Sequence, residues 1–229
     1  MKYKKLYLFF TVLVILLAAC SNSETSSESS SETLSDGEKV LNIAIPADPK
    51  TLDPQKSGAL SQIAIAENSF NGLVRFPPGI VDVSQIEGDL AEKWEHNEDA
   101  TQWTFYLRQG VQWHKGYGEV TAEDIKASFE RVKDPENGIT AASSYRHVES
   151  IETPDKYTVV FNLSRPDPIF LTKVLAYSGG FIVNTKALEE KDEFIGTGPF
   201  VIEKYNTQDS VVAVKHKEFF RGEPKIDKI

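Results

Sequence analysis

The sequence predicts an α/β fold, because strand-like and helix-like hydrophobic patterns alternate along residues 40–217. Alternating large apolar residues predict strands, most clearly from Trp103 to Leu107. Apolar residues three or four positions apart predict helices, most clearly after Thr121. The chain has 229 residues, of which 40% are hydrophobic, and this is enough for a buried core in one or two domains.

The other strand predictions rest on the same alternation. Residues 40–45 predict a half-buried strand. Residues 102–113 predict a hairpin that turns at a Gln-Gly pair. A strand pair is predicted on either side of the turn at 153–156, and residues 200–205 and 211–217 predict a final hairpin.

Three segments predict helices. Residues 60–71 carry apolar side chains at helical spacing, with a glycine after them as a stop. The best-marked helix begins after Thr121, whose side chain forms a capping box with Asp124. Its expected buried stripe is Ile125, Phe129 and Val132. Residues 170–175 predict a short buried helix.

The N-terminus has the pattern of a secretory signal with a lipoprotein cleavage site. Three lysines precede the apolar run 6–19, which is shorter than the roughly 20 residues that a membrane-spanning helix needs. Small residues then lead into Cys20, the chain's single cysteine. The pattern predicts a signal peptide at 1–19; an ordinary cleaved signal followed by a free thiol is the alternative.

Residues 20–37 are almost entirely Ser, Glu, Thr and Asn, which predicts a disordered Ser/Glu tether. The formal net charge of the chain is −9, and loss of the three signal lysines makes it more negative. An acidic protein is repelled by nucleic acid and by anionic lipid, so neither is an expected partner. With no second cysteine, the folded part has no intramolecular disulfide.

Several short motifs occur in a characteristic order. They are Thr51–Pro54, Leu90–Trp94, Trp103–His114, Val120–Arg131, Gly196–Phe200 and Gly222–Ile229. In this order they resemble the extracellular solute-binding proteins of peptide and nickel ABC transporters, the oligopeptide-binding group known as solute-binding family 5. The resemblance covers roughly residues 40–229, and the predicted lipoprotein signal agrees with it.

The resemblance implies a periplasmic-binding-protein type II fold, present as the first lobe only. Residues 38–57 and 177–229 would form the core of this lobe, still incomplete, and residues 58–176 a smaller inserted α+β subdomain. In the family the chain continues into a second lobe and returns, so the sequence is expected to be truncated after the first lobe.

The function that the resemblance implies is capture of peptides for an ABC permease in the membrane. Cys20 would carry a diacylglyceryl thioether, with palmitate among its acyl chains, and would anchor the protein at the extracellular face of the bacterial cytoplasmic membrane. No catalysis and no cofactor are expected. By similarity, the first-lobe residues nearest the ligand would be Asp48, Lys50, Tyr145, Tyr177 and Phe219.

Three of these ligand assignments have a structural alternative. Asp48 precedes a proline and fits a turn, while Tyr145 and Tyr177 fit ordinary packing. Gly196–Pro199 is interpreted as a structural turn. The three tryptophans are expected in the core rather than on a sugar-stacking platform: Trp94, Trp103 and Trp113. The four histidines are expected at surface or partly buried positions: His96, His114, His147 and His216.

Two other classes of function stay open. The first is a one-lobed lipoprotein that acts as an adaptor, or is a nonfunctional remnant. The second is a receptor for another solute, such as sugar, haem or nickel. Enzymes are disfavoured because the chain has no nucleophile elbow, no phosphate-binding loop and no second cysteine.

Overall fold

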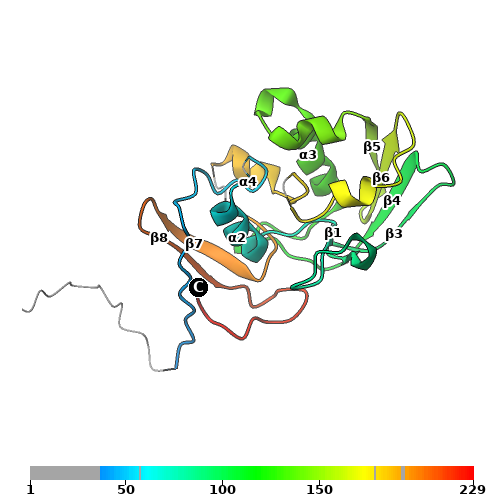
Figure 1. Cartoon of the computed structure of the whole chain (residues 1–229). Coiled ribbons are helices and arrows are strands. Elements are labelled where there is room, and N and C mark those ends of the chain that lie inside the picture. The colour runs from blue at the N-terminus through cyan, green and yellow to red at the C-terminus, as the bar shows by residue number, and fades with distance from the viewer. Residues whose placement is uncertain (1–36, 57, 178, 192–193) are drawn as a thin grey trace, which may run out of the picture. The chain divides into compact units, whose positions relative to one another are not determined.

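An antiparallel sheet packed against a helix forms the larger part of the structure (Figure 1). The computed structural model describes residues 37–56, 58–177, 179–191 and 194–229. The predicted signal peptide, Cys20 and the tether lie outside the described residues, apart from Gly37 at the end of the tether.

The described residues form the following elements. The helices are α2 (Leu60–Ser69), α3 (Ala122–Lys133) and α4 (Thr185–Glu189). The strands are β1 (Val74–Arg75), β2 (Glu87–Gly88), β3 (Ala91–His96), β4 (Gln102–Leu107), β5 (Val148–Asp155), β6 (Thr158–Leu163), β7 (Phe200–Asn206) and β8 (Ser210–Lys215). Short 3₁₀ turns lie at η1 (Val83–Gln85), η2 (His114–Gly116), η3 (Pro135–Asn137), η4 (Thr140–Tyr145) and η5 (Phe170–Lys173).

The main sheet has the strand order β3-β4-β6-β5, with every neighbouring pair antiparallel. The predicted strand at 102–107 and the predicted pair around 153–156 are confirmed as β4 and as β5 with β6. The predicted hairpin over 102–113 is wrong, because β4 pairs with β3 and β6. Residues 111–113 are not a strand, and Gln112 makes only an isolated bridge to Glu119.

Helix α3 begins where the sequence predicts. Asp124 N–H donates to the Thr121 hydroxyl, while Thr121 N–H donates to the Asp124 carboxylate at 2.8 Å. Glu123 and Asp124 also place negative charge in the first turn, where it interacts favourably with the helix dipole and stabilises the helix. The predicted stripe is buried, as Ile125, Phe129 and Val132 are each at most 1% exposed.

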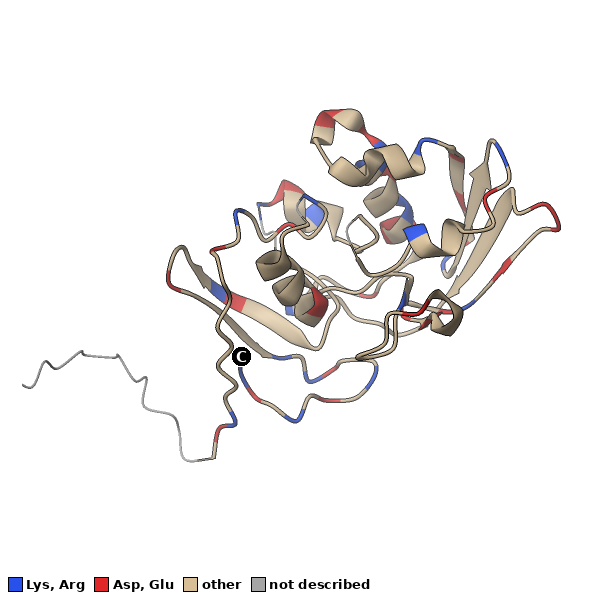
Figure 2. Ribbon diagram, viewed as in Figure 1, with Lys and Arg blue, Asp and Glu red and all other residues tan. Residues whose placement is uncertain are grey.

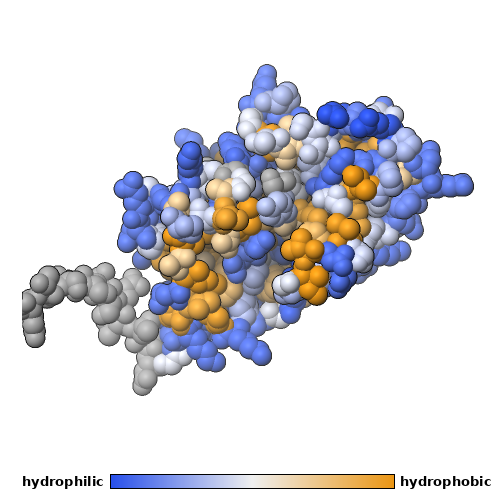
Figure 3. Space-filling view, viewed as in Figure 1, coloured by the Kyte–Doolittle hydropathy of each residue, from blue (hydrophilic) through white to orange (hydrophobic). Residues whose placement is uncertain are grey.

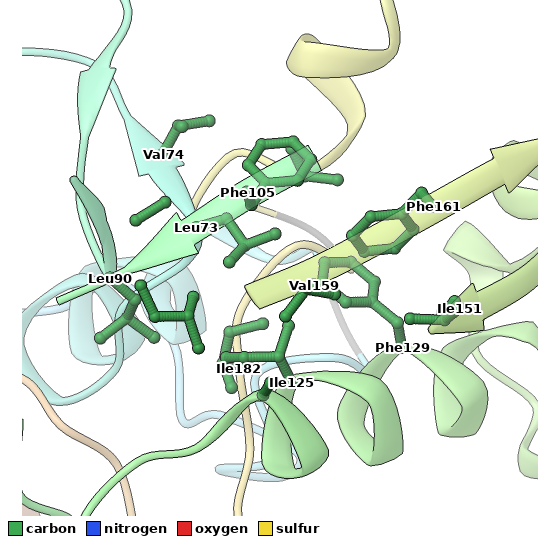
Figure 4. Packing of buried hydrophobic residues seen from close by; sticks show 14 of the residues in the cluster. Leu73, Val74, Leu90, Phe105, Ile125, Phe129, Ile151, Val159, Phe161 and Ile182 are labelled. Carbon is green, nitrogen blue, oxygen red and sulfur yellow. The ribbon is translucent and has the colours of Figure 1, made fainter. Parts of the chain in front are cut away.

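Aromatic rings join the helix to the sheet (Figure 4). Phe129 of α3 meets Phe161 of β6 edge-on at a centroid distance of 5.1 Å, and Phe161 meets Phe105 of β4 at 5.6 Å. Edge-to-face pairs of this kind add to the free energy gained from burying the rings. The same cluster includes Ile182 and Ile195 from later in the chain. Glu38–Ile229 forms one compact unit, and the predicted boundary of an inserted subdomain at 58–176 stays a prediction.

The predicted helix at 60–71 is confirmed as α2. Of the face expected to be buried, Ile63 and Phe70 are buried, whereas Leu60 is 78% exposed. The helix leads at Phe70 into extended backbone. The short buried helix predicted at 170–175 is a single 3₁₀ turn, η5, with Phe170 buried.

The final hairpin is confirmed as β7 with β8. The predicted strand at 40–45 is wrong, since only Val40 forms a bridge, parallel to Lys228. Leu41 is 41% exposed and Ile43 is 55% exposed. Alternation alone does not make a strand, because the backbone also needs a hydrogen-bonding neighbour on at least one side.

Candidate functional site

Asp48 and Lys50 lie on the exposed loop that follows the segment 41–47. The Tyr205 hydroxyl of β7 lies 3.2 Å from an Asp48 carboxylate oxygen and donates to the Pro49 carbonyl at 2.6 Å. The hairpin therefore holds this loop in place. Asp48 also lines a cavity of about 450 Å³.

Tyr145 is buried, 1% exposed, and its ring lies 5.5 Å from that of Phe129. Its hydroxyl donates to the Lys173 carbonyl and lies 3.3 Å from the Gly179 carbonyl. Burial raises the pKa of Tyr145, so the phenol remains a donor. These contacts favour a packing role for Tyr145. Its hydroxyl contacts carbonyls on both sides of Tyr177 and so holds the segment that carries Tyr177.

Tyr177 is the most exposed aromatic of the candidate set, at 51%. Its carbonyl accepts from Gly180 N–H at 2.6 Å, which makes a tight turn. Phe219 is half-buried, and its ring lies 4.8 Å from that of Phe220. Within the described residues, no hydrogen bond joins Asp48, Lys50 or Phe219 to Tyr145 or Tyr177.

A buried polar network supports two of these segments, and sequence reasoning did not find it. Arg131 of α3 forms an ion pair with Asp53 and also donates to the Gln55 side chain. The Gln55 amide nitrogen donates to the Ser128 hydroxyl at 3.0 Å and to the Phe181 carbonyl at 2.8 Å. Helix α3 thus ties the loop after Lys50 to the segment after Tyr177.

The Gly196–Pro199 loop is held by two histidines, as expected of a structural turn. His114 Nε2 lies 2.9 Å from the Gly198 carbonyl, while Gly196 N–H points to His114 Nδ1 at 3.3 Å. His216 Nδ1 lies 3.2 Å from the same carbonyl. A Cβ on Gly196 would collide with the Ser69 carbonyl oxygen, so this approach to α2 requires glycine.

The prediction of a surface or partly buried position is wrong for His114, which is 0% exposed. Burial, together with the charges of His216 and Lys115, lowers the pKa of His114 to about 4, although the hydrogen bond to the Gly198 carbonyl acts in the opposite direction. A neutral His114 ring with its proton on Nε2 fits both loop contacts. Nε2 then donates to the Gly198 carbonyl, and Nδ1 accepts from the Gly196 N–H.

Asp89 is a second buried charge missed by the sequence analysis. Its carboxylate accepts from the Asn71 amide, the Gly72 N–H and Arg221, at 3.0 to 3.2 Å. The Thr197 hydroxyl donates in turn to Asn71 at 2.9 Å. Burial raises the pKa of Asp89, while these hydrogen bonds act in the opposite direction.

The remaining expectations concern metals, membranes and tryptophans. Among the described residues, no cluster of three His, Cys, Asp or Glu side chains is arranged to hold a metal ion. In the same residues, no helix combines the length and apolar character needed to span a bilayer.

Trp103 and Trp113 are 3% and 2% exposed, and Trp94 packs against the core, which confirms the packing interpretation.

The architecture is similar to one lobe of the solved periplasmic binding proteins. The chain belongs to the bacterial extracellular solute-binding proteins, family 5, whose model matches residues 85–229. It is 31% identical to di/tripeptide-binding protein 4 of Pseudomonas aeruginosa over 83% of its length, and it spans about 40% of that relative.

Solved structures show the same fold. The chain is similar to the binding protein MoaA of A. tumefaciens R10 in complex with mannopinic acid, with 38% identity and a TM-score of 0.79 over 84% of this chain and 40% of that one. It is also similar to DppA of Helicobacter pylori in complex with the peptide STSA, with 26% identity and a TM-score of 0.70 over 80% and 40% of the two chains.

Proposed function

We propose that the protein is the lipid-anchored extracellular solute-binding component of an ABC importer and that it captures peptides. The family match carries the proposal. The name of the P. aeruginosa relative and the peptide in the H. pylori complex support a peptide as the solute.

In this proposal the peptide lies over the exposed part of the candidate set. Asp48 offers a carboxylate to a peptide amine, Lys50 offers an amine to a carboxylate, and Tyr177 offers an exposed ring. Phe219 contributes from the C-terminal segment. Tyr145 does not contact the peptide and acts by positioning Tyr177, because its hydroxyl lies against the Gly179 carbonyl in the turn after Tyr177.

The direct test is calorimetric titration of the full chain with di-, tri- and tetrapeptides. Saturable binding that Tyr177→Ala weakens and Val81→Ala leaves unchanged supports the proposal; both residues are exposed, at 51% and 88%, and Val81 lies outside the candidate set. Binding of all peptides with the same affinity by the wild type and Tyr177→Ala would argue against this surface.

A second candidate solute follows from the A. tumefaciens structure, whose ligand is mannopinic acid. The same titration with mannopinic acid, oligosaccharides and Ni²⁺ separates these receptors from a peptide receptor. Saturation by one of these solutes, with no heat from peptides, would replace peptide as the solute and would leave the receptor class intact.

A further inference from the structure

Gln55 joins the two segments that carry Lys50 and Tyr177. Residues 48–55 lead towards α2, and the segment after Tyr177 leads into α4. The Gln55 side chain comes from the first segment and is 3% exposed. Its amide nitrogen donates to the Phe181 carbonyl of the second segment at 2.8 Å. A buried side-chain amide therefore links the two segments directly.

The contacts of the Gln55 amide fix which way it faces. Its oxygen accepts from Arg131, whose side chain has only donors, so the NH₂ group faces away from Arg131. The amide nitrogen then meets the Phe181 carbonyl and, at 3.0 Å, the Ser128 hydroxyl. Ser128 is 0% exposed, and its hydroxyl also accepts the Val183 N–H at 3.1 Å. Both ends of the amide are thus used, and a side chain without N–H donors cannot replace it.

The backbone from which the Gln55 side chain extends has a defined position. Gln55 N–H donates to the Asp53 carboxylate at 3.0 Å, and Asp53 N–H donates to the Thr51 hydroxyl at 3.1 Å. The ion pair between Asp53 and Arg131 adds a charged contact to α3. The amide of Gln55 can therefore set the position of Phe181.

Tyr177 is coupled to Phe181 through a tight turn. Gly180 N–H donates to the Tyr177 carbonyl at 2.6 Å, and Phe181 follows directly. A Cβ on Gly180 would lie 1.8 Å from the Leu175 carbonyl oxygen, so the chain folds back closely here and requires glycine. A shift of Phe181 would therefore displace Tyr177.

The ring of Tyr177 is accessible to a solute. It is 51% exposed, and within the part of the chain that the structure describes it has no aromatic neighbour and its hydroxyl has no hydrogen-bond partner. Figure 3 shows hydrophobic and hydrophilic side chains interspersed over the region of α2 and α4. A peptide presents the same mixture of groups, and a tyrosine ring with its hydroxyl can contact both kinds.

We propose that Gln55 is a positioning residue of the proposed solute site. Its amide holds the turn of Tyr177 at a fixed place relative to the loop of Lys50, so that the Tyr177 ring meets one side chain of the bound peptide. Peptides with an aromatic side chain gain most, since paired rings attract each other beyond the area that they bury. The inference rests on the function proposed above, and Gln55 itself does not contact the solute.

The first experiment compares two tripeptides, Ala-Phe-Ala and Ala-Ala-Ala, by calorimetric titration of the full chain. The wild type should prefer Ala-Phe-Ala by roughly fivefold. Gln55→Met removes the N–H donors at nearly constant length and should reduce this preference to less than about twofold. Ala-Ala-Ala should bind almost as it binds the wild type, because Tyr205 still holds the loop of Lys50. Equal binding of the two tripeptides by the wild type would overturn the proposal.

Two further variants separate positioning from lost stability. Ile151→Val removes a buried methyl group from β5, outside both segments, where Ile151 is 3% exposed. It should lower the urea midpoint and leave the preference unchanged. Ser128→Ala keeps the bond from Gln55 to Phe181 and removes only the neighbouring hydroxyl. It should reduce the preference by roughly twofold, and it provides the test if Gln55→Met does not fold.

A double-mutant cycle tests whether Gln55 acts through Tyr177. Tyr177→Ala alone should abolish the preference for Ala-Phe-Ala. In that background, Gln55→Met should change the affinity for Ala-Phe-Ala by less than about twofold, because the ring that it positions is absent. An equal effect of Gln55→Met with and without the Tyr177 ring would contradict the proposal.

Hydrogen exchange of the full chain tests the positioning without a solute. The amides of Gly180 and Val183 should exchange at least about fivefold faster in Gln55→Met than in the wild type, whereas Ile151→Val should not single them out. Unchanged exchange in Gln55→Met would overturn the proposal, and so would faster exchange with an unchanged preference for Ala-Phe-Ala. Faster exchange with no tripeptide binding by the wild type would overturn the proposed function and support the positioning of the turn.

Discussion

Folding favours the neutral form of the His114 imidazole. Protonation would place a buried cation beside His216 and Lys115. The pKa of His114 falls from 6.5 to about 4 on folding. Between these values the unfolded chain binds more protons, so the free energy of unfolding decreases as the pH falls from 6.5 towards 4.

The expected loss from His114 is about 3 kcal/mol over this interval, since one pKa unit corresponds to about 1.4 kcal/mol. Urea unfolding of the full chain at several pH values measures it. His114→Gln keeps a donor for the Gly198 carbonyl and cannot titrate, so its unfolding free energy should depend less on pH. An unchanged pH dependence in this variant would show that another group is responsible.

Arg131 should be among the most sensitive charged positions of the chain. Its ion pair with Asp53 is largely buried, with side-chain exposures of 14% and 3%. Arg131→Met would leave the Asp53 carboxylate buried without its partner, at an expected cost of about 3 to 5 kcal/mol. Chemical unfolding, followed by tryptophan fluorescence, measures this cost.

The matched control for Arg131 is Lys156→Met. Lys156 pairs with Glu119 at 2.6 Å, but its side chain is 51% exposed. Water solvates both groups when this pair is broken, so we expect little change in stability. If the two variants unfold at the same urea concentration, the buried network does not anchor α3.

At the level of elements, the capping box of α3 should contribute measurably to stability. Thr121→Ala removes the hydroxyl that accepts the Asp124 N–H, and the expected cost is about 1 kcal/mol. Thr121→Ser retains the hydroxyl and should recover most of this loss. Equal destabilisation by both substitutions would indicate that the threonine methyl, rather than the cap, is responsible.

The elements that the sequence predicted correctly are those with local signals. Helix α3 has a capping box and an apolar stripe within its own residues, and β5 with β6 and β7 with β8 are joined by short turns. The hairpin at 102–113 failed because the neighbour of β4 is β3, whose burial does not alternate regularly. Pairing between distant segments leaves no such local signal.

The same reason limits what the sequence shows of the candidate site. Asp53 and Arg131 each belong to a motif recognised in the sequence, yet nothing local indicates that residues 78 positions apart form an ion pair. His114 and His216 meet in the same way, with ring centroids 4.9 Å apart. Tyr177 was identified through family resemblance, and its exposure is consistent with that role.

For the whole molecule, the charge distribution bears on how the protein is held at a membrane. Acidic and basic residues are interspersed along the ribbon in Figure 2, and the net charge is −9. An anionic bilayer surface would repel such a protein, so electrostatics gives it no affinity for that surface. In the function proposed above, membrane attachment therefore depends on the proposed lipid at Cys20, for which two acyl chains are enough.

This anchoring can be tested on the native protein. The sequence has no Lys or Arg between Cys20 and Lys39, so trypsin should release residues 20–39 as a single N-terminal peptide. We expect this peptide, prepared from the membrane fraction, to carry the mass of a diacylglyceryl group and to be absent from Cys20→Ser cells. High salt should leave the wild type on the membrane, because the attachment is apolar. An unmodified peptide that begins at Cys20 would show that the signal is cleaved without lipidation, and release by salt would show that the anchor is electrostatic.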